Sequence, residues 1–316
     1  MDVIEHTPEI YHLTFGVHEP VLKIKSGQRV HVGVPDCDGF GLDGIPLPDD
    51  KFEKSIHTSI PIANPTAGPY YIEGAEVGDA IVVNIHSVKP NRRLGRTGIS
   101  AGQIHIAQKH FRTISDTDMN VSVPRKIFQW DIDVARNIAT FKLEKSTRPK
   151  VEVPLSPFVG CIAVAPMNGQ FFDGLALGNF GGNMDVSAVA ADCRIFLPVF
   201  ASGAYLFLGD IHAAQGDGEI IGGGIEISGT IEFSVTLKKG KTISWPRIEN
   251  SSQIGVIASG TTMDEASQIA NAQLVLWMAH EYGFDRWEAL NVLSQTGQSR
   301  PGNSKSVCCT ISKKYL

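Results

Sequence analysis

The sequence predicts a mainly β protein with an α+β portion and one or two helices near its C-terminal end. Short β-branched runs recur along most of the chain, which is typical of strands. The 32 glycines and 17 prolines supply the tight turns that such strands need. A helical apolar stripe appears in one region only, between residues 264 and 293.

The length and composition allow a full globular core. The chain has 316 residues, of which 42% are hydrophobic and 19% charged. We expect an N-terminal β-rich part over residues 1–150. A second β-rich part, over residues 151–316, contains the site motif and the C-terminal helices. The two parts are expected to form one intertwined unit.

Predicted strands in the first part are short apolar runs bounded by turn signals. They cover residues 21–24, 30–34, 80–85, 128–133 and 138–143. The last two form a hairpin. Prolines at both ends of the stretch 64–69 exclude a helix there and indicate a fixed loop.

The second part combines buried strands with two helices. The predicted strands cover residues 159–166, two segments within 194–208, and 225–237. Pro198 and the pair Ser202-Gly203 divide the run 194–208. A helix is predicted from Asp264 to Tyr282, with Thr261 or Thr262 as its cap. A second helix covers residues 284–293, with Asp285 as its cap.

Charge and cysteine content limit the partners and the compartment. A net charge of -5 argues against a nucleic-acid partner. There is no apolar run of membrane-spanning length and no visible secretion signal, so we expect no membrane partner. Five cysteines without a CxxC pair fit reduced thiols in a cytoplasmic protein.

The strongest candidate site is the segment GDIHAAQGDGE at residues 209–219. It follows a buried strand and places an imidazole, an amide and several carboxylates within eleven positions. Imidazole and carboxylate groups bind zinc and other divalent ions, and a spare carboxylate can act as general base. The alternative is a tight hairpin turn, for which Gly-Asp-Gly suffices.

Two further segments are weaker candidates. The glycine-rich stretch 178–185 can form an anion-binding nest that ends at Asp185, or a long flexible turn. Asp36 and Asp38 follow the strand 30–34 and are either site residues or part of an Asx turn. His86, as a single histidine after a strand, is more often structural.

Nucleophilic catalysis has less support. The sequence has no G-x-S-x-G elbow. Cys37 lies between two aspartates, whose charge disfavours a thiolate. Cys161 and Cys193 occur in apolar or mixed sequence and are interpreted as structural.

Three ordered motifs resemble those of the acetamidase/formamidase family. NPTAGPYYIEGAEVGD at 64–79 is similar to the family's NPxTGPxYVEGAExGD, and GGNMD at 181–185 matches its GGNMD loop. The third match runs from LPV at 197–199 to the segment at 209–219, and it resembles LPV…GA…GDxHAxQGDGE.

The resemblance implies a β-sandwich or barrel, a homodimer, and hydrolysis of a short amide such as formamide or acetamide to a carboxylate and ammonia. It also implies a divalent metal, zinc or calcium. Carried over residue by residue, Asp36, Asp185 and His212 are the expected metal ligands. Glu219 or Asp217 is the expected general base, and Gln215 with Asn183 is expected to orient the amide.

A metal suits amide chemistry, because an amide carbonyl is a weak electrophile and its amine a poor leaving group. Two departures from the family leave a longer or differently charged amide open: VPDCDG at 34–39, where the family commonly has T-x-D-A, and the tail at 300–310. The alternatives are a non-catalytic protein that binds a small ligand, and a hydrolase or lyase of another C–N bond on the same scaffold.

Overall fold

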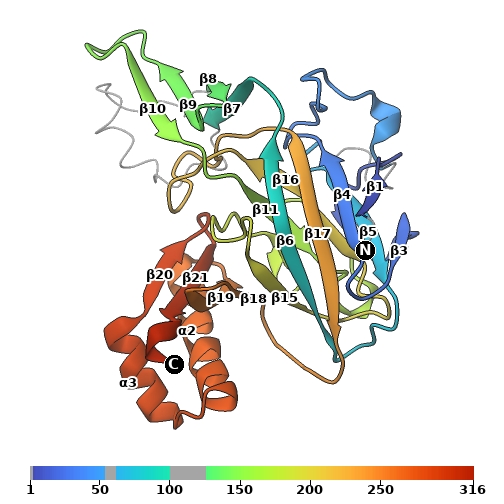
Figure 1. Cartoon of the computed structure of the whole chain (residues 1–316), viewed down its shortest axis with the longest axis vertical. Coiled ribbons are helices and arrows are strands. Elements are labelled where there is room, and N and C mark those ends of the chain that lie inside the picture. Colours follow the sequence, from blue (N-terminus) through green and yellow to red (C-terminus); the bar gives the residue numbers. More distant parts are fainter. Residues whose placement is uncertain (1–2, 54–61, 100–125) are drawn as a thin grey trace.

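The structure, a computed structural model, describes residues 3–53, 62–99 and 126–316 (Figure 1). Met1 and Asp2, at the start of the segment considered for a secretion signal, lie outside these residues. The strands are β1 (Val3–His6), β2 (Thr14–Phe15), β3 (Leu22–Ile24), β4 (Arg29–Val34), β5 (Thr66–Ile72), β6 (Ala80–Pro90), β7 (Leu94–Ile99), β8 (Lys126–Asp133), β9 (Ile138–Lys142), β10 (Lys150–Pro154), β11 (Phe158–Ala163), β12 (Phe172–Asp173), β13 (Leu177–Gly178), β14 (Gly181–Asn183), β15 (Arg194–Pro198), β16 (Leu206–His212), β17 (Gly229–Lys238), β18 (Arg247–Glu249), β19 (Gln253–Ser259), β20 (Gln298–Pro301) and β21 (Ser306–Ser312). The helices are α2 (Met263–Glu281), α3 (Arg286–Thr296) and the short 3-10 turns η1 (Asp49–Lys51), η2 (Met167–Gly169) and η3 (Lys313–Tyr315).

Two large sheets form an open sandwich. One has nine strands in the order β1-β4-β17-β6-β15-β18-β19-β21-β20, and the other has six in the order β13-β14-β11-β16-β5-β3. The long strands β6 and β17 pair antiparallel along the middle of the first sheet (Figure 1). Among the described residues neither sheet closes on itself, so the sandwich alternative is confirmed and the barrel alternative is wrong.

One apolar core joins the two sheets. Tyr70 of β5 and Phe233 of β17 are both fully buried, and their rings meet edge to face with centroids 5.3 Å apart. Both sheets combine strands from either side of residue 150, because β5 pairs with β16 and β6 pairs with β17. The hairpin β8–β9 and its neighbours β7 and β10 form a separate four-stranded sheet.

The two C-terminal helices cover one end of the nine-stranded sheet (Figure 1). Leu274 and Met278 of α2 pack with Val256 of β19 in a second buried cluster. Thr262 caps α2 by accepting a hydrogen bond from the backbone N–H of Glu265. Asp285 caps α3 in the same way, so both predicted helices and their caps are confirmed. No helix among the described residues has the length and apolar content needed to span a membrane.

Two predicted loops are wrong. Strand β5 begins at Thr66, inside the stretch 64–69, although Pro69 lacks an N–H group. The pairing of β5 with β16 shifts register between Leu206 and Leu208, opposite Pro69. Pro69 is therefore not required to donate a backbone hydrogen bond to β16. Within the stretch 178–185, strand β14 pairs with β11. A side chain at Gly182 would collide with the carbonyl of Ala176, which explains the glycine.

The fold places candidate groups at strand ends. Strand β16 is buried along its whole length between β11 and β5, and it ends at His212. Strand β14 ends at Asn183, two residues before Asp185. Strand β5 of the motif at 64–79 belongs to the same sheet, so all three motifs noted in the sequence converge there.

Packing of α2 provides a test of the core. Leu274→Ala is expected to lower the free energy of unfolding by about 2–5 kcal/mol, because Leu274 is fully buried in the second cluster. Leu290→Ala in α3 is the control, because Leu290 is 45% exposed, and we expect a change of about 0.5 kcal/mol or less. Urea denaturation followed by circular dichroism measures both. Equal losses in the two variants would contradict this packing.

Candidate active site

The ends of β14 and β16 open into a cavity of about 570 Å³. Its wall brings together polar groups from segments far apart in the sequence. They are Cys37, Asn64, Asn183, Asp185, Asp210, His212, Glu219 and Glu226. Apolar side chains such as Ile62, Leu175 and Ile127 line other parts of the wall.

His212 lies at the centre of a carboxylate cluster. Its Nε2 is 3.1 Å from Glu226 Oε2 and 3.5 Å from Asp210 Oδ1. Asp185 Oδ1 lies 4.0 Å from the same nitrogen. All four side chains are buried. Glu219 approaches the other side of the ring, with its Oε1 3.9 Å from Nδ1.

The backbone holds these acids in conformations that most residues avoid. Asp185, Asp210 and Glu219 have φ values of 51°, 58° and 49°, in the left-handed region. Gly160 of β11 lies below two of them, and a Cβ there would come within 2.7 Å of Asp185 Oδ1 and 2.8 Å of Asp210 Oδ2. The local strain therefore serves to crowd the carboxylates together.

Neutral amides occupy one oxygen of each aspartate. Asn183 and Asn303 donate hydrogen bonds to Asp185 Oδ2, at 2.9 and 2.8 Å. Asn64 donates to Asp210 Oδ2 at 3.1 Å and to Asn183 Oδ1 at 2.6 Å. The Oδ1 atoms of both aspartates have no hydrogen-bond partner in the part of the chain that the structure describes. Each carboxylate is thus fixed at one oxygen and free at the other.

Gln215 fixes the tautomer of His212. Its Nε2 donates to the backbone carbonyls of Asp185 and Gly302, at 2.8 and 3.0 Å. The Oε1 atom of Gln215 must then face His212 Nδ1, 2.6 Å away. Nδ1 therefore carries a proton and donates it, and Nε2 is directed to the carboxylates.

The buried carboxylates of the cluster repel one another, which contributes to the raised pKa values of three of them. Burial raises the pKa of Glu226 to about 8 and that of Asp185 to about 7, with Asp210 adding to both and His212 opposing. Burial and the Asp185 charge raise the pKa of Glu219 to about 10. Burial lowers the pKa of His212, but Glu226 and Asp210 outweigh it and raise that pKa well above its usual value.

The donor set fits a divalent cation. Asp185 Oδ1, Asp210 Oδ1 and Glu226 Oε2 are buried atoms without hydrogen-bond partners among the described residues, and all face His212 Nε2. Asp185, Asp210 and His212 each offer one ligand atom within 4.8 Å of the others, and His212, Glu219 and Glu226 form an overlapping group. Imidazole nitrogen and carboxylate oxygen are both atoms that bind zinc. A cation among them would supply the partner that each oxygen lacks.

Asp36 and Asp217, predicted as a metal ligand and as a possible general base, lie outside this donor set. Asp36 is fully buried, and its Oδ2 accepts hydrogen bonds from Arg92 at 2.6 Å and Arg96 at 3.3 Å. Its Oδ1 accepts from two backbone N–H groups, so both oxygens are occupied. Asp38 pairs with Arg96 as well. Asp217 is 40% exposed at its side chain and pairs with Arg300 at 2.9 Å.

The other predicted residues lie in the site. Asp185, His212 and Glu219 face the cavity. Asn183 lines the cavity as well. The amide groups of Asn183 and Gln215 hydrogen-bond neighbouring protein groups and position Asp185 and His212. That they also orient a substrate amide stays a prediction.

Sequence reasoning missed Asp210, Glu226, Asn64 and Asn303 as site residues. Asp210 had a signal, since two positions along a strand separate it from His212 and both side chains then share a face. Glu226 reaches the site through an isolated bridge with His212, and Asn303 comes from the tail. No local sequence pattern predicts either contact.

Comparisons with known proteins match most of the chain to one family. The model of the Acetamidase/Formamidase family matches residues 15–171 and 178–290. A formamidase candidate of Schizosaccharomyces pombe is 27% identical over 257 residues, which are 68% of this chain and 61% of the relative. The chain thus spans about three fifths of that relative's length. The acetamidase of Mycolicibacterium smegmatis is 51% identical over 61 residues, 19% of this chain and 15% of the relative.

Solved structures of the same fold cover nearly the whole chain. The crystal structure of an acetamidase from Yersinia enterocolitica has a TM-score of 0.83 and 31% identity, covering 99% of this chain and 92% of that one. The acetamidase of Bacillus halodurans has a TM-score of 0.80 and 28% identity, with 99% and 98% covered.

The pairing of Asp36 predicts a large effect on stability. Arg92→Met is expected to lower the free energy of unfolding by about 3 kcal/mol, because it leaves the buried Asp36 carboxylate with less compensation. Arg29→Met is the control. Arg29 is 45% exposed where it pairs with Glu232, so we expect a loss below about 1 kcal/mol. Urea denaturation measures both, and a larger loss for Arg29→Met would contradict the assignment.

Proposed function

Since this chain belongs to the acetamidase/formamidase family, we propose that it hydrolyses a short-chain amide to a carboxylate and ammonia at the cluster around His212. The observation that carries the proposal is the convergence of three carboxylate oxygens on one imidazole nitrogen at the wall of a cavity, where no described residue gives these oxygens a hydrogen bond. An arrangement of this kind costs stability and is typical of a functional site.

His212 Nε2, Asp185 Oδ1, Asp210 Oδ1 and Glu226 Oε2 would hold a divalent metal ion. When bound, such an ion supplies a Lewis acid that polarises the amide carbonyl and lowers the pKa of water. The imidazole ligand favours zinc over calcium, because calcium prefers oxygen ligands throughout. Asn64, Asn183, Asn303 and Gln215 keep the donor atoms in place and do not neutralise their charge.

Glu219 is the residue proposed to move protons. It lines the cavity, and it is not one of the three carboxylates that face His212 Nε2. Burial and the neighbouring carboxylates raise the pKa of Glu219, and the positive charge of a divalent ion held nearby would lower it and restore the carboxylate form. That carboxylate accepts a proton from the attacking water and then delivers it to the departing nitrogen. The C–N bond breaks as the new C–O bond becomes part of the carboxylate product, and ammonia leaves.

Cys37 lines the same cavity and offers a covalent alternative that we do not favour. Burial, with Glu226 and Asp210 nearby, raises the pKa of its thiol well above the usual value. The thiolate, which is the nucleophile, is therefore disfavoured.

The size of the cavity bears on the substrate. Sites of 300–1,000 Å³ typically hold ligands much larger than formamide. At about 570 Å³, this one accommodates amides with longer acyl groups, and its apolar wall suits an aliphatic chain.

We further propose a homodimer in the cytoplasm. The family resemblance supports the dimer, and light scattering on the purified protein tests it. The five cysteines are free, as is usual in a reducing compartment.

Ammonia release from formamide, acetamide and longer aliphatic amides tests the proposal. We expect release that stops on chelation and returns with added zinc. Asp210→Asn should lower kcat/KM more than about 100-fold, because it replaces a charged carboxylate of the cluster with a neutral amide that binds a metal ion weakly.

Asp217→Asn is the matched control, because Asp217 belongs to the same segment but pairs with Arg300 outside the cavity. It should retain wild-type activity. Release that survives both chelation and Asp210→Asn would refute the metal-dependent mechanism. No release from any amide would refute amide hydrolysis.

A further inference from the structure

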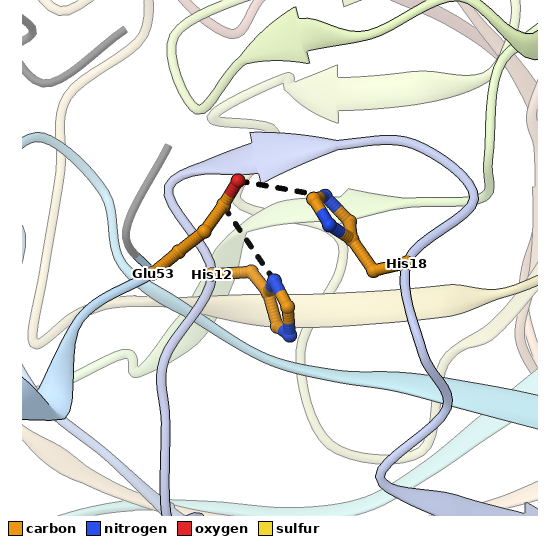
Figure 2. A group of neighbouring side chains, drawn as sticks. All are labelled: His12, His18 and Glu53. Atoms are coloured by element: carbon orange, nitrogen blue, oxygen red, sulfur yellow. Dashed lines mark ion pairs between the residues drawn. The ribbon is translucent and has the colours of Figure 1, made fainter. Parts of the chain in front are cut away.

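A second group of potential ligands lies outside the cluster around His212 and shares no residue with it. It consists of His12, His18 and Glu53 (Figure 2). His12 precedes β2, His18 follows it, and Glu53 lies shortly after η1. Two segments of the N-terminal region, residues 12–18 and the stretch after η1, therefore meet here.

The two imidazoles face a single carboxylate. His12 Nδ1 is 3.5 Å from Glu53 Oε2, and His18 Nε2 is 3.9 Å from Glu53 Oε1. The rings lie 4.4 Å apart between centroids, and Figure 2 shows both turned toward Glu53. One donor atom from each residue lies within 4.8 Å of the others.

Glu53 is held firmly in this position. Its carboxylate accepts hydrogen bonds from the backbone N–H groups of Leu13 and Thr14, at 3.0 and 3.2 Å. The Thr14 hydroxyl donates to it at 2.9 Å. Partners of this kind orient the carboxylate ligands of metal sites.

The His12 imidazole has a buried nitrogen whose hydrogen bonding is not satisfied by the described residues. The residue is only 9% exposed, and its Nδ1 is buried without a hydrogen-bond partner among the described residues. A buried polar atom without a partner carries a desolvation cost. The separation from Glu53 is too long for a good hydrogen bond, yet it suits two ligands of one ion.

Aromatic side chains shield the group from solvent. Phe207 meets the His12 ring edge to face at 5.8 Å, and Phe171 meets the His18 ring at 5.0 Å. An ion in such surroundings is held more strongly, because water screens it less.

We propose that His12 Nδ1, His18 Nε2 and Glu53 bind a second divalent transition-metal ion of the zinc class. Two imidazoles and one glutamate are a known ligand set for zinc. In this structure His18 Nε2 donates to the Thr14 hydroxyl at 2.9 Å and to the Thr14 carbonyl at 3.2 Å. Binding of the ion replaces this proton and both hydrogen bonds, while the Thr14 hydroxyl keeps its bond to Glu53.

The ion would brace one wall of the active-site cavity. The backbone of His12 pairs with Thr66 through two hydrogen bonds of 2.9 Å. Thr66 is two residues from Asn64, which holds Asp210. The second site therefore ties the segment that carries Asn64 to the loop at Glu53, a stabilising role apart from the chemistry.

The test counts bound zinc in a protein that already carries Asp210→Asn. The variants are equilibrated with zinc chloride and desalted, and their metal is measured by elemental analysis. Adding His18→Gln is expected to remove about one further equivalent of zinc per chain, because glutamine is a poor zinc ligand. Adding His18→Cys, which restores a zinc ligand, should return it.

His31→Gln is the matched control, since His31 also pairs with a glutamate, Glu5, but has a single imidazole. It should leave the zinc content unchanged. The proposal is overturned if His18→Gln retains as much zinc as its Asp210→Asn parent, or if His31→Gln loses as much. Circular dichroism confirms folding, and zinc should raise the Tm of the parent but not of its His18→Gln derivative. Because the readout is bound metal, the result is independent of amide hydrolysis.

Discussion

The structure is organised around an electrostatic conflict at His212 Nε2. Asp185, Asp210 and Glu226 each direct to this nitrogen one buried oxygen that has no hydrogen-bond partner within residues 3–53, 62–99 and 126–316. Left-handed backbone at both aspartates and a glycine below them hold the oxygens close. Such an arrangement is unfavourable without a cation, and the surrounding fold must maintain it. A fully buried strand between two neighbours provides the required rigidity.

The chemistry of the neighbouring groups separates this cluster from an ordinary buried ion pair. Asn64, Asn183 and Asn303 supply neutral donors, which fix a carboxylate and leave its charge available. Asp36 is equally buried, but two guanidinium groups neutralise it. The surroundings of Asp185 and Asp210 leave their negative charge available to a cation, whereas the charge of Asp36 is already compensated. Buried aspartates of this chain therefore differ in the charge of the groups that hold them.

Much of the fold was predictable because its signals are local. The caps Thr262 and Asp285, the hairpin of β8 and β9, and the break at Pro198 all act within a few residues. Asp185, His212 and Glu219 were predictable because two short motifs, at 181–185 and 209–219, carry them. Asp36 was predicted as a metal ligand, although its partner is Arg92. Glu226, which contacts His212, was not predicted. In both cases the partner comes from a distant segment of the chain. No local pattern encodes such contacts.

Crystallography with anomalous scattering at the zinc edge would show whether a metal ion binds at the His212 cluster. We expect an anomalous peak at about 2.0–2.2 Å from His212 Nε2 and from the free oxygens of Asp185, Asp210 and Glu226. The peak should disappear on chelation together with ammonia release. An active protein whose His212 cluster shows no peak, with His212 Nε2 bonded only to the carboxylates, would refute a metal ion at this cluster.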